Sequence, residues 1–402
     1  ATPGSGARIS TPEGAVMDSG DDLAYQPGQL TPEQLMAAMR PTFRQNSMNI
    51  FRRFPREKTA QMVTFYTGAL ALRWFRASEC DDAERPVVMI QQVDYPSRAV
   101  MQALTTIGLA LLLAGSLAMS AIAKFGSEEQ KQEFLPPMAR GEKAGCFGLT
   151  EPHGGSDPSN MLTKAVKDGD HWVINGAKRW IGIANIADVA IIWADTEDGV
   201  RGFIVPTDTP GYTATPIAGK LSMRASIQCH IDLENVRVPE ALRLPLAEGL
   251  GAPFKCLTEA RYGIIWGVMG AARASIDVAV KFSQERILFG KPLAATQITQ
   301  TKLADCFLEF EKGVLLSHHI GKLKDSGTLT HEQISVGKLN NVREAVGIVS
   351  TVRSILGGDG VTSEYPIMRH MMNLESVRTY EGTDEVHALV VGRALTGEDA
   401  FR

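Results

Sequence analysis

The sequence has few cysteines, and they are too widely spaced to suggest a metal site. Its 402 residues include eight histidines and five cysteines, and neither type falls in a CxxC or HExxH pattern: Cys80, Cys146, Cys229, Cys256 and Cys306. We therefore expect no metal site. An odd number of isolated cysteines favours buried thiols in a reducing compartment.

The sequence also lacks an excess of basic residues. Its formal net charge is −4, so no nucleic-acid partner is expected. With 44% hydrophobic residues the chain can bury a large core, which favours two or three domains.

No convincing membrane segment is present. Residues 99–123 carry no charge and are long enough to span a bilayer, but threonine, glycine and serine dilute them and no aromatic belt flanks them. A buried core helix is the better interpretation. Residues 1–30 have no apolar stretch typical of a signal peptide.

The pattern predicts an α+β fold in four segments. Residues 1–30 resemble a disordered tail, and residues 31–145 a helical domain that starts at Thr31-Pro32 and includes a short helix after Ser127. Residues 146–245 form a β domain, predicted to be a small barrel or sandwich. Residues 251–402 form an antiparallel four-helix bundle with helical runs at 254–269, 297–324, 331–356 and 384–396.

Turn signals define the β domain. Strands at 162–166 and 171–174 flank Asp168-Gly169, and Asn175-Gly176 is interpreted as the next turn. Further strands are expected at 189–193, 201–205 and 227–233.

A local break near the C-terminus surrounds Glu381. Gly382 permits a sharp turn, Thr383 is suited to cap the next helix, and Asp384 and Glu385 suit its first turn. Glu381 is thus a candidate positioned base, although a solvated surface glutamate is the default interpretation of the local pattern.

Several motifs resemble those of one family. Tyr380-Glu-Gly-Thr383, with Leu356-Gly-Gly-Asp-Gly360, resembles the catalytic segment of the acyl-CoA dehydrogenases. His387-Ala-Leu-Val-Val-Gly-Arg-Ala394 resembles the glutaryl-CoA dehydrogenase branch. The resemblance spans about residues 124–402 and is poor before them. It implies that Glu381 removes the α-proton of an acyl-CoA while hydride passes to the flavin of FAD.

Two segments resemble the family's flavin contacts. Residues 147–157 form a turn-rich stretch that on local pattern alone could be an ordinary connection, and residues 178–182 could simply place Trp180 in a core. Gly182 stands where most of the family has a threonine whose hydroxyl reaches flavin N5. The implied cofactor-binding residues are Phe147, Leu149, Thr150, Gly155, Ser156, Trp180, Ile181, Gly182, Arg286, Phe289, Gln297, Ser354, Ile355, Leu356, Gly357, Gly358, Thr383 and Glu385.

The resemblance also implies a substrate channel and an oligomer. Arg261 matches a CoA contact, although alone it would suit an internal ion pair. The implied substrate-binding residues are Ser156, Phe254, Leu257, Thr258, Arg261, Tyr380, Gly382 and Phe401. Arg286, Gln297 and residues 354–358 match positions that reach FAD of a neighbouring subunit, so a homo-oligomer, dimer or tetramer, is expected. Gly357-Gly358 could equally be a helix C-cap.

The substrate implied is a short or branched acyl-CoA. The arginine that holds a distal carboxylate in glutaryl-CoA dehydrogenases would fall at Gly108, in the uncharged stretch. The alternatives are a decarboxylating glutaryl-CoA dehydrogenase, an acyl-CoA oxidase, and a non-catalytic acyl-thioester-binding or assembly protein. The expected electron acceptor is electron-transferring flavoprotein. The expected location is the cytoplasm in a bacterium, or the mitochondrial matrix or peroxisome in a eukaryote.

Overall fold

A computed structural model of the chain describes residues 9–10, 16–17 and 115–401, which fall in two compact units, 1–58 and 59–402. In the first unit, β1 (Ile9–Ser10) pairs antiparallel with β2 (Val16–Met17). All that follows concerns the second unit. The helix start predicted at Thr31 and residues 99–114 of the uncharged stretch lie outside the described residues.

The described chain of the second unit begins in helix. Residues 115–125 are helical, with Ala118, Ala121 and Ile122 fully buried. The short helix predicted after Ser127 is α3 (Glu128–Ala139), and Ser127 caps it by accepting a hydrogen bond from Gln130 N. The Gln130 amide also donates to two main-chain oxygens of residues 241–243, which fixes α3 against the end of the sheet.

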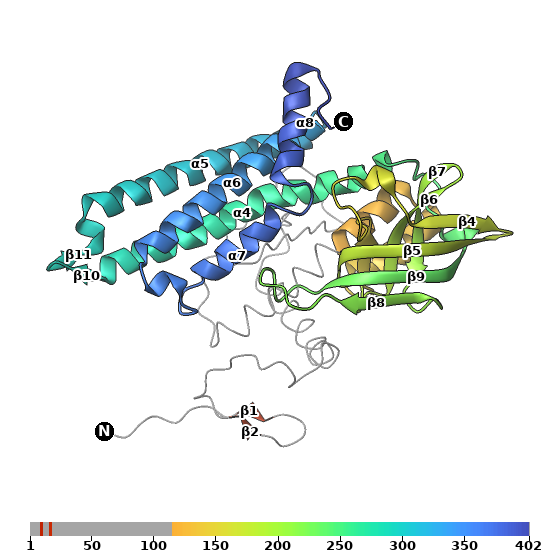
Figure 1. Cartoon of the computed structure of the whole chain (residues 1–402), viewed down its shortest axis with the longest axis horizontal. Helices are drawn as coiled ribbons and strands as arrows, with labels where there is room; N and C mark the ends of the chain where they lie inside the picture. The colour runs from red at the N-terminus through yellow and green to blue at the C-terminus, as the bar shows by residue number, and fades with distance from the viewer. Residues whose placement is uncertain (1–8, 11–15, 18–114, 402) are drawn as a thin grey trace, which may run out of the picture. The chain divides into compact units, whose positions relative to one another are not determined.

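The middle of the chain forms one curled seven-stranded sheet with the order β3-β6-β4-β5-β9-β8, and β7 pairs with β6 (Figure 1). Every residue of β6 is buried except Asp195, and β9 alternates buried and partly exposed residues over much of its length. The strands are β3 (Gly145–Gly148), β4 (Lys164–Asp168), β5 (His171–Gly182), β6 (Val189–Thr196), β7 (Gly199–Pro206), β8 (Tyr212–Pro216) and β9 (Gln228–Pro239).

The predicted turn at Asn175-Gly176 is wrong. Strand β5 continues through both residues and bulges between Ile174 and Gly176, where its register with β9 shifts. Gly176 has φ +147°, and a Cβ there would lie 2.6 Å from Thr163 Cα. Glycine is needed here for a close backbone approach within the sheet, which the dipeptide alone does not distinguish from a hairpin turn.

The C-terminal part is helical, and α4, α5 and α6 lie side by side in Figure 1. Their shared core includes Val268, Phe310 and Val349. The buried Asn341 amide donates to Ile265 O, Gly313 O and Ser317 Oγ, and so ties these three helices together. The helices are α4 (Gly251–Glu285), α5 (Gln297–Asp325), α6 (His331–Ile355), α7 (Ile367–Val377) and α8 (Asp384–Thr396).

Short elements connect these parts. A hairpin of β10 (Ile287–Leu288) and β11 (Lys291–Pro292) links α4 to α5. Single 3₁₀ turns occur at η1 (Pro158–Asn160), η2 (Glu240–Leu242), η3 (Leu293–Ala295) and η4 (Asp359–Val361). Among the described residues, α4 alone is long and apolar enough to cross a bilayer, and 56% of its apolar window is buried inside the protein. A buried core helix meets the same criterion.

Direct contacts join the sheet to the helices. The loop after β8 reaches α7, where Met223 N donates to Asn373 Oδ1 at 2.7 Å and the Ser376 and Ser222 hydroxyls lie 2.5 Å apart. The start of α4 shares an apolar cluster with Trp193 of β6. The segments that carry the site are therefore packed within one unit.

Candidate active site

Glu381 lies in the turn between α7 and α8. Its φ is +56°, a left-handed conformation that is uncommon for a non-glycine residue, and Gly382 follows at +91°. Thr383 then caps α8 by accepting a hydrogen bond from Val386 N, as predicted. The strained backbone at Glu381 therefore lies directly before a well-capped helix.

The Glu381 carboxylate is buried and lacks part of its hydrogen bonding. Oε2 has no hydrogen-bond partner among the described residues. Burial raises the pKa of Glu381 to about 7, and the positive charges of Arg261 and Lys338 oppose that rise. A carboxyl that titrates near neutral pH in a buried position has the proton affinity that a general base needs.

Side chains from three helices hold the turn around Glu381. Lys338 Nζ on α6 lies 2.6 Å from Tyr380 O and 2.5 Å from Gly382 O. Arg261 Nε on α4 donates to Glu381 O at 2.8 Å, and His387 Nε2 on α8 lies 3.1 Å from the same oxygen. Each carbonyl of residues 380–382 thus accepts from a side chain.

The sequence prediction included Arg261 but not Lys338 or His387. One signal was available for Lys338, because it interrupts the apolar face that Ile334, Val342 and Ala345 form on α6. A lysine on a buried helix face requires a partner.

A buried ion pair joins the two predicted flavin segments. Lys178 Nζ lies 2.7 Å from Glu151 Oε1, and both side chains are at most 5% exposed. Arg179 N also donates to Thr150 O at 2.8 Å. Burial lowers the pKa of Lys178. Burial alone would raise the pKa of Glu151, but the charge of Lys178 and the main-chain N–H donors have the larger effect and lower it below its usual value. The segments 147–157 and 178–182 are therefore adjacent.

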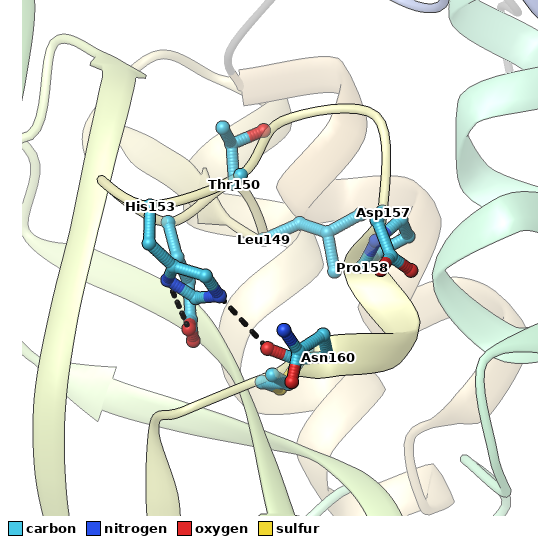
Figure 2. A pocket seen from close by; sticks show the side chains of 9 residues that line it. Leu149, Thr150, His153, Asp157, Pro158 and Asn160 are labelled. Carbon is cyan, nitrogen blue, oxygen red and sulfur yellow. Dashed lines mark hydrogen bonds and ion pairs between the residues drawn. The ribbon is translucent and has the colours of Figure 1, made fainter.

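Figure 2 shows a small pocket beside this pair. The His153 ring lies 2.8 Å from Asn160 O and 3.6 Å from Glu151 Oε2. The pocket is lined by Leu149, Thr150, Glu151, His153, Gly154, Asp157, Pro158, Asn160 and Met161. Six of these residues come from the segment that was predicted to face the flavin.

Trp180 is the most unusual residue of the second segment. It is 52% exposed, has φ +64°, and lies at a register shift in β5 with the Arg179 guanidinium 5.3 Å from its ring centre. An exposed, strained tryptophan beside residues 149–160 fits a planar aromatic ligand such as an isoalloxazine ring.

The other predicted cofactor residues are distributed between core and surface. The side chains of five belong to the buried cores, so that any contact they make with a cofactor would use their outer atoms or main chain: Phe147, Leu149, Ile181, Ile355 and Leu356. The exposed ones are Gly155, Ser156, Arg286, Phe289, Gln297, Gly357, Gly358 and Glu385, and Gly182, Ser354 and Thr383 are partly exposed.

Six of the eight predicted substrate residues lie on α4 or in the Glu381 turn, and the other two, Ser156 and Phe401, lie elsewhere. Tyr380 and Gly382 flank Glu381, and Arg261 contacts it. Leu257 and Thr258 are half-buried on α4, whereas Phe254 and Phe401 are exposed. Within the described part of the chain no cluster of metal-ligating side chains occurs.

Comparison with known proteins decides the family. The N-terminal, middle and C-terminal domains of acyl-CoA dehydrogenases match residues 97–142, 146–236 and 247–396. This chain belongs to the acyl-CoA dehydrogenase family. It is 37% identical to the mitochondrial short-chain specific acyl-CoA dehydrogenase of Bos taurus over 295 residues, which cover 72% of this chain and 71% of that one.

Solved structures agree. The glutaryl-CoA dehydrogenase of Mycobacterium smegmatis in complex with FADH2 is 53% identical, with a TM-score of 0.73 over 75% of this chain and 78% of that one. The butyryl-CoA dehydrogenase of Megasphaera elsdenii is 33% identical, with a TM-score of 0.67 over 73% and 81%. The predicted α+β fold, FAD as the cofactor, and the glutaryl-CoA dehydrogenase-like branch are confirmed. The chain is an oxidoreductase that acts on acyl-CoA, which disfavours a non-catalytic protein.

Proposed function

We propose that this enzyme catalyses FAD-dependent α,β-dehydrogenation of a short or branched acyl-CoA, with Glu381 as the base. The observation that carries the proposal is the Glu381 carboxylate, whose Oε2 is buried without a hydrogen-bond partner among the described residues, and whose pKa burial raises. A solvated surface glutamate, the alternative that the sequence allowed, would not be buried in this way.

Glu381 would act twice in this reaction. Its carboxylate removes the α-proton, and its main-chain N–H, which has no partner among the described residues, donates to the thioester oxygen. Such a hydrogen bond acidifies the α-carbon because it stabilises the charge that develops on the oxygen. FAD, when bound, accepts the hydride that leaves the β-carbon.

The two flavin segments would hold the cofactor. Thr150 and Trp180 would contact the isoalloxazine face, and the exposed Ser156 would donate to a phosphate. The buried Glu151–Lys178 ion pair links these two segments. Gly182 offers no hydroxyl to flavin N5, so a water molecule is the available donor there.

The proposal of a short or branched acyl chain rests on the absence of charged residues in the stretch 99–123. Residues 99–123 provide no cation, and burying a carboxylate without one costs several kcal/mol. Lys124 directly follows this stretch, but its Nζ pairs with Glu259 Oε1 at 3.4 Å. A second candidate is decarboxylating glutaryl-CoA dehydrogenase, which the 53% identity to the mycobacterial enzyme favours.

We further propose electron-transferring flavoprotein as the acceptor and a homo-oligomer as the assembly. Arg286 directly precedes the β10–β11 hairpin, the fully exposed Phe289 lies at its tip, and Gln297 begins the helix that follows. An exposed apolar hairpin tip suits a contact with a second subunit. Relatives occur both in mitochondria and in bacteria, so we propose the matrix or the bacterial cytoplasm as the location.

Anaerobic titration of the flavin-loaded protein with butyryl-, isobutyryl- and glutaryl-CoA tests the function. We expect butyryl- or isobutyryl-CoA to bleach the flavin faster than glutaryl-CoA. Faster bleaching by glutaryl-CoA with release of CO2 would establish the second candidate. No bleaching by any acyl-CoA would overturn both.

A further inference from the structure

The turn that carries Glu381 has no main-chain partner for its carbonyls among the described residues. Lys338 donates hydrogen bonds to the carbonyls of Tyr380 and Gly382, on either side of Glu381. Arg261 and His387 donate to the carbonyl of Glu381 itself. Because a carbonyl oxygen can only accept, all of these side-chain nitrogens act as donors. Lys338 bridges two of these carbonyls, at 2.6 and 2.5 Å.

Lys338 is an unusual residue to find in this position. Its side chain is only 1% exposed, on the face of α6 that packs into the bundle. Burying an ammonium costs several kcal/mol, and two neutral carbonyls do not cancel its charge. Burial accordingly lowers the pKa of Lys338 to about 8.

The charged groups around Lys338 identify its counter-charge. Arg261 from α4 adds a second positive charge, and His387 from α8 is neutral because burial lowers its pKa to about 3. Asp384 at the start of α8 is already paired, at 3.4 Å with Arg343 and at 3.2 Å with Arg378. Among the described residues near Lys338, the remaining anion is therefore the Glu381 carboxylate.

We propose that Lys338 is a positioning residue that fixes the turn aiming Glu381 and supplies positive charge that keeps its carboxylate ionised. This inference rests on the proposed role of Glu381 as the base. Through its two hydrogen bonds Lys338 holds the left-handed backbone of Glu381, and through its charge it opposes the effect of burial on the carboxylate. Without Lys338, the Glu381 side chain would be held less firmly, and its carboxyl would stay protonated up to a higher pH.

Two substitutions separate these effects. Lys338→Met removes the charge and both hydrogen bonds while keeping a long side chain. Lys338→Gln removes the charge but retains one donor group. Lys312→Gln is the matched control, because Lys312 is an exposed lysine on α5 that pairs with Glu309 at 2.6 Å.

The principal measurement follows Glu381 without any substrate. The infrared spectrum of each protein minus that of its Glu381→Gln counterpart isolates the carbonyl stretch of the protonated Glu381 carboxyl. Its intensity against pH gives the midpoint of titration. FAD content, thermal unfolding and the pH profile of flavin bleaching by butyryl-CoA are measured in parallel.

We expect both Lys338 variants to raise the midpoint of Glu381 by about one pH unit or more. The bleaching rate at a pH below both midpoints should fall about tenfold in Lys338→Gln, and further in Lys338→Met because the turn is also released. Lys312→Gln should change neither quantity.

An unchanged midpoint in a folded Lys338 variant would overturn the proposal, even if stability or FAD content fell. If Lys338→Met does not fold, Lys338→Gln decides the question. If the wild-type protein is not bleached by any acyl-CoA, the proposed function fails, but the infrared midpoint still tests Lys338.

Discussion

Arg261 Nε donates to the main-chain oxygen of Glu381 at 2.8 Å, although 120 residues of sequence separate the two. This hydrogen bond attaches the turn between α7 and α8 to α4, the longest helix described. The guanidinium also places a positive charge near the Glu381 carboxylate and so lowers its pKa against the effect of burial. An arginine predicted to contact CoA is therefore also an internal partner of the candidate base.

The first prediction concerns the base itself. Glu381→Gln keeps the shape of the side chain but removes its ability to accept a proton, so flavin bleaching by acyl-CoA should slow by roughly 10²- to 10⁴-fold or more. FAD should remain bound. The matched control is Glu375→Gln, an exposed glutamate that pairs with Arg378 at 3.6 Å. Bleaching of Glu381→Gln at a near wild-type rate would show that another group is the base.

The second prediction concerns stability against pH. Burial raises the pKa of Glu381 from 4.5 to about 7, so the folded state binds this proton more tightly than the unfolded state. Wild-type stability should therefore fall as pH rises from about 4.5 to 7, by about 3 kcal/mol for this group.

Glu381→Gln lacks this titration, so it should unfold at higher urea concentration than wild type at pH 8 and show no such advantage at pH 4.5. Urea unfolding of both proteins at the two pH values measures the difference. Equal pH dependence of the two proteins would contradict the raised pKa.

Much of the fold could be predicted because its signals are local. Helix periodicity placed α5, α6 and α8 within two residues of their observed ends, and Thr383 was recognised as a cap. The prediction of a turn at Asn175-Gly176 failed because the constraint on Gly176 comes from Thr163, which directly precedes β4. Lys338 was missed for the same reason, since its partners are main-chain oxygens more than 40 residues away in sequence. His387 was missed although its partner, Glu381 O, is only six residues away, because its contact depends on the left-handed backbone at Glu381.

The third prediction concerns Gly382. A Cβ at this position would lie 2.7 Å from His387 Nε2, and the φ of +91° disfavours any other residue. Gly382→Ala should therefore displace His387 or the turn, destabilise the protein by about 1–3 kcal/mol, and lower the bleaching rate.

Gly392→Ala is the control for this substitution. Gly392 lies within α8, and a Cβ there would meet no atom within 4 Å. Because alanine favours helix over glycine, this variant should be neutral or more stable by up to about 1 kcal/mol. Thermal unfolding of both variants tests the pair, and equal losses would refute a specific role for Gly382.

The fourth prediction concerns the support of the flavin segments. Lys178→Met leaves the buried Glu151 carboxylate without its ion-pair partner, so stability should fall by about 3–5 kcal/mol and FAD should dissociate more readily. Adding Glu151→Gln removes the uncompensated charge and should restore part of that stability.

The exposed pair of Lys164 with Asp195 provides the comparison. Lys164→Met should cost less than about 1 kcal/mol, because exposed ion pairs contribute little. Urea unfolding and the flavin absorbance that remains after gel filtration report the two effects. A Lys178→Met protein as stable as Lys164→Met would contradict the prediction.

The last prediction links cofactor retention to assembly. Arg286 ends α4 with an exposed side chain, directly before the exposed apolar residues Ile287, Leu288 and Phe289. If Arg286 reaches FAD held mainly by a second subunit, each bound FAD stabilises the oligomer by mass action. Arg286→Ala should then weaken FAD binding and oligomer formation together, and a tenfold loss of FAD affinity corresponds to about 1.4 kcal/mol.

The control is Lys281→Ala, since Lys281 is an exposed cation on the same helix, and it should change neither FAD binding nor oligomer formation. Sedimentation velocity with simultaneous flavin detection measures both quantities, and a monomer that retains its flavin would refute the link.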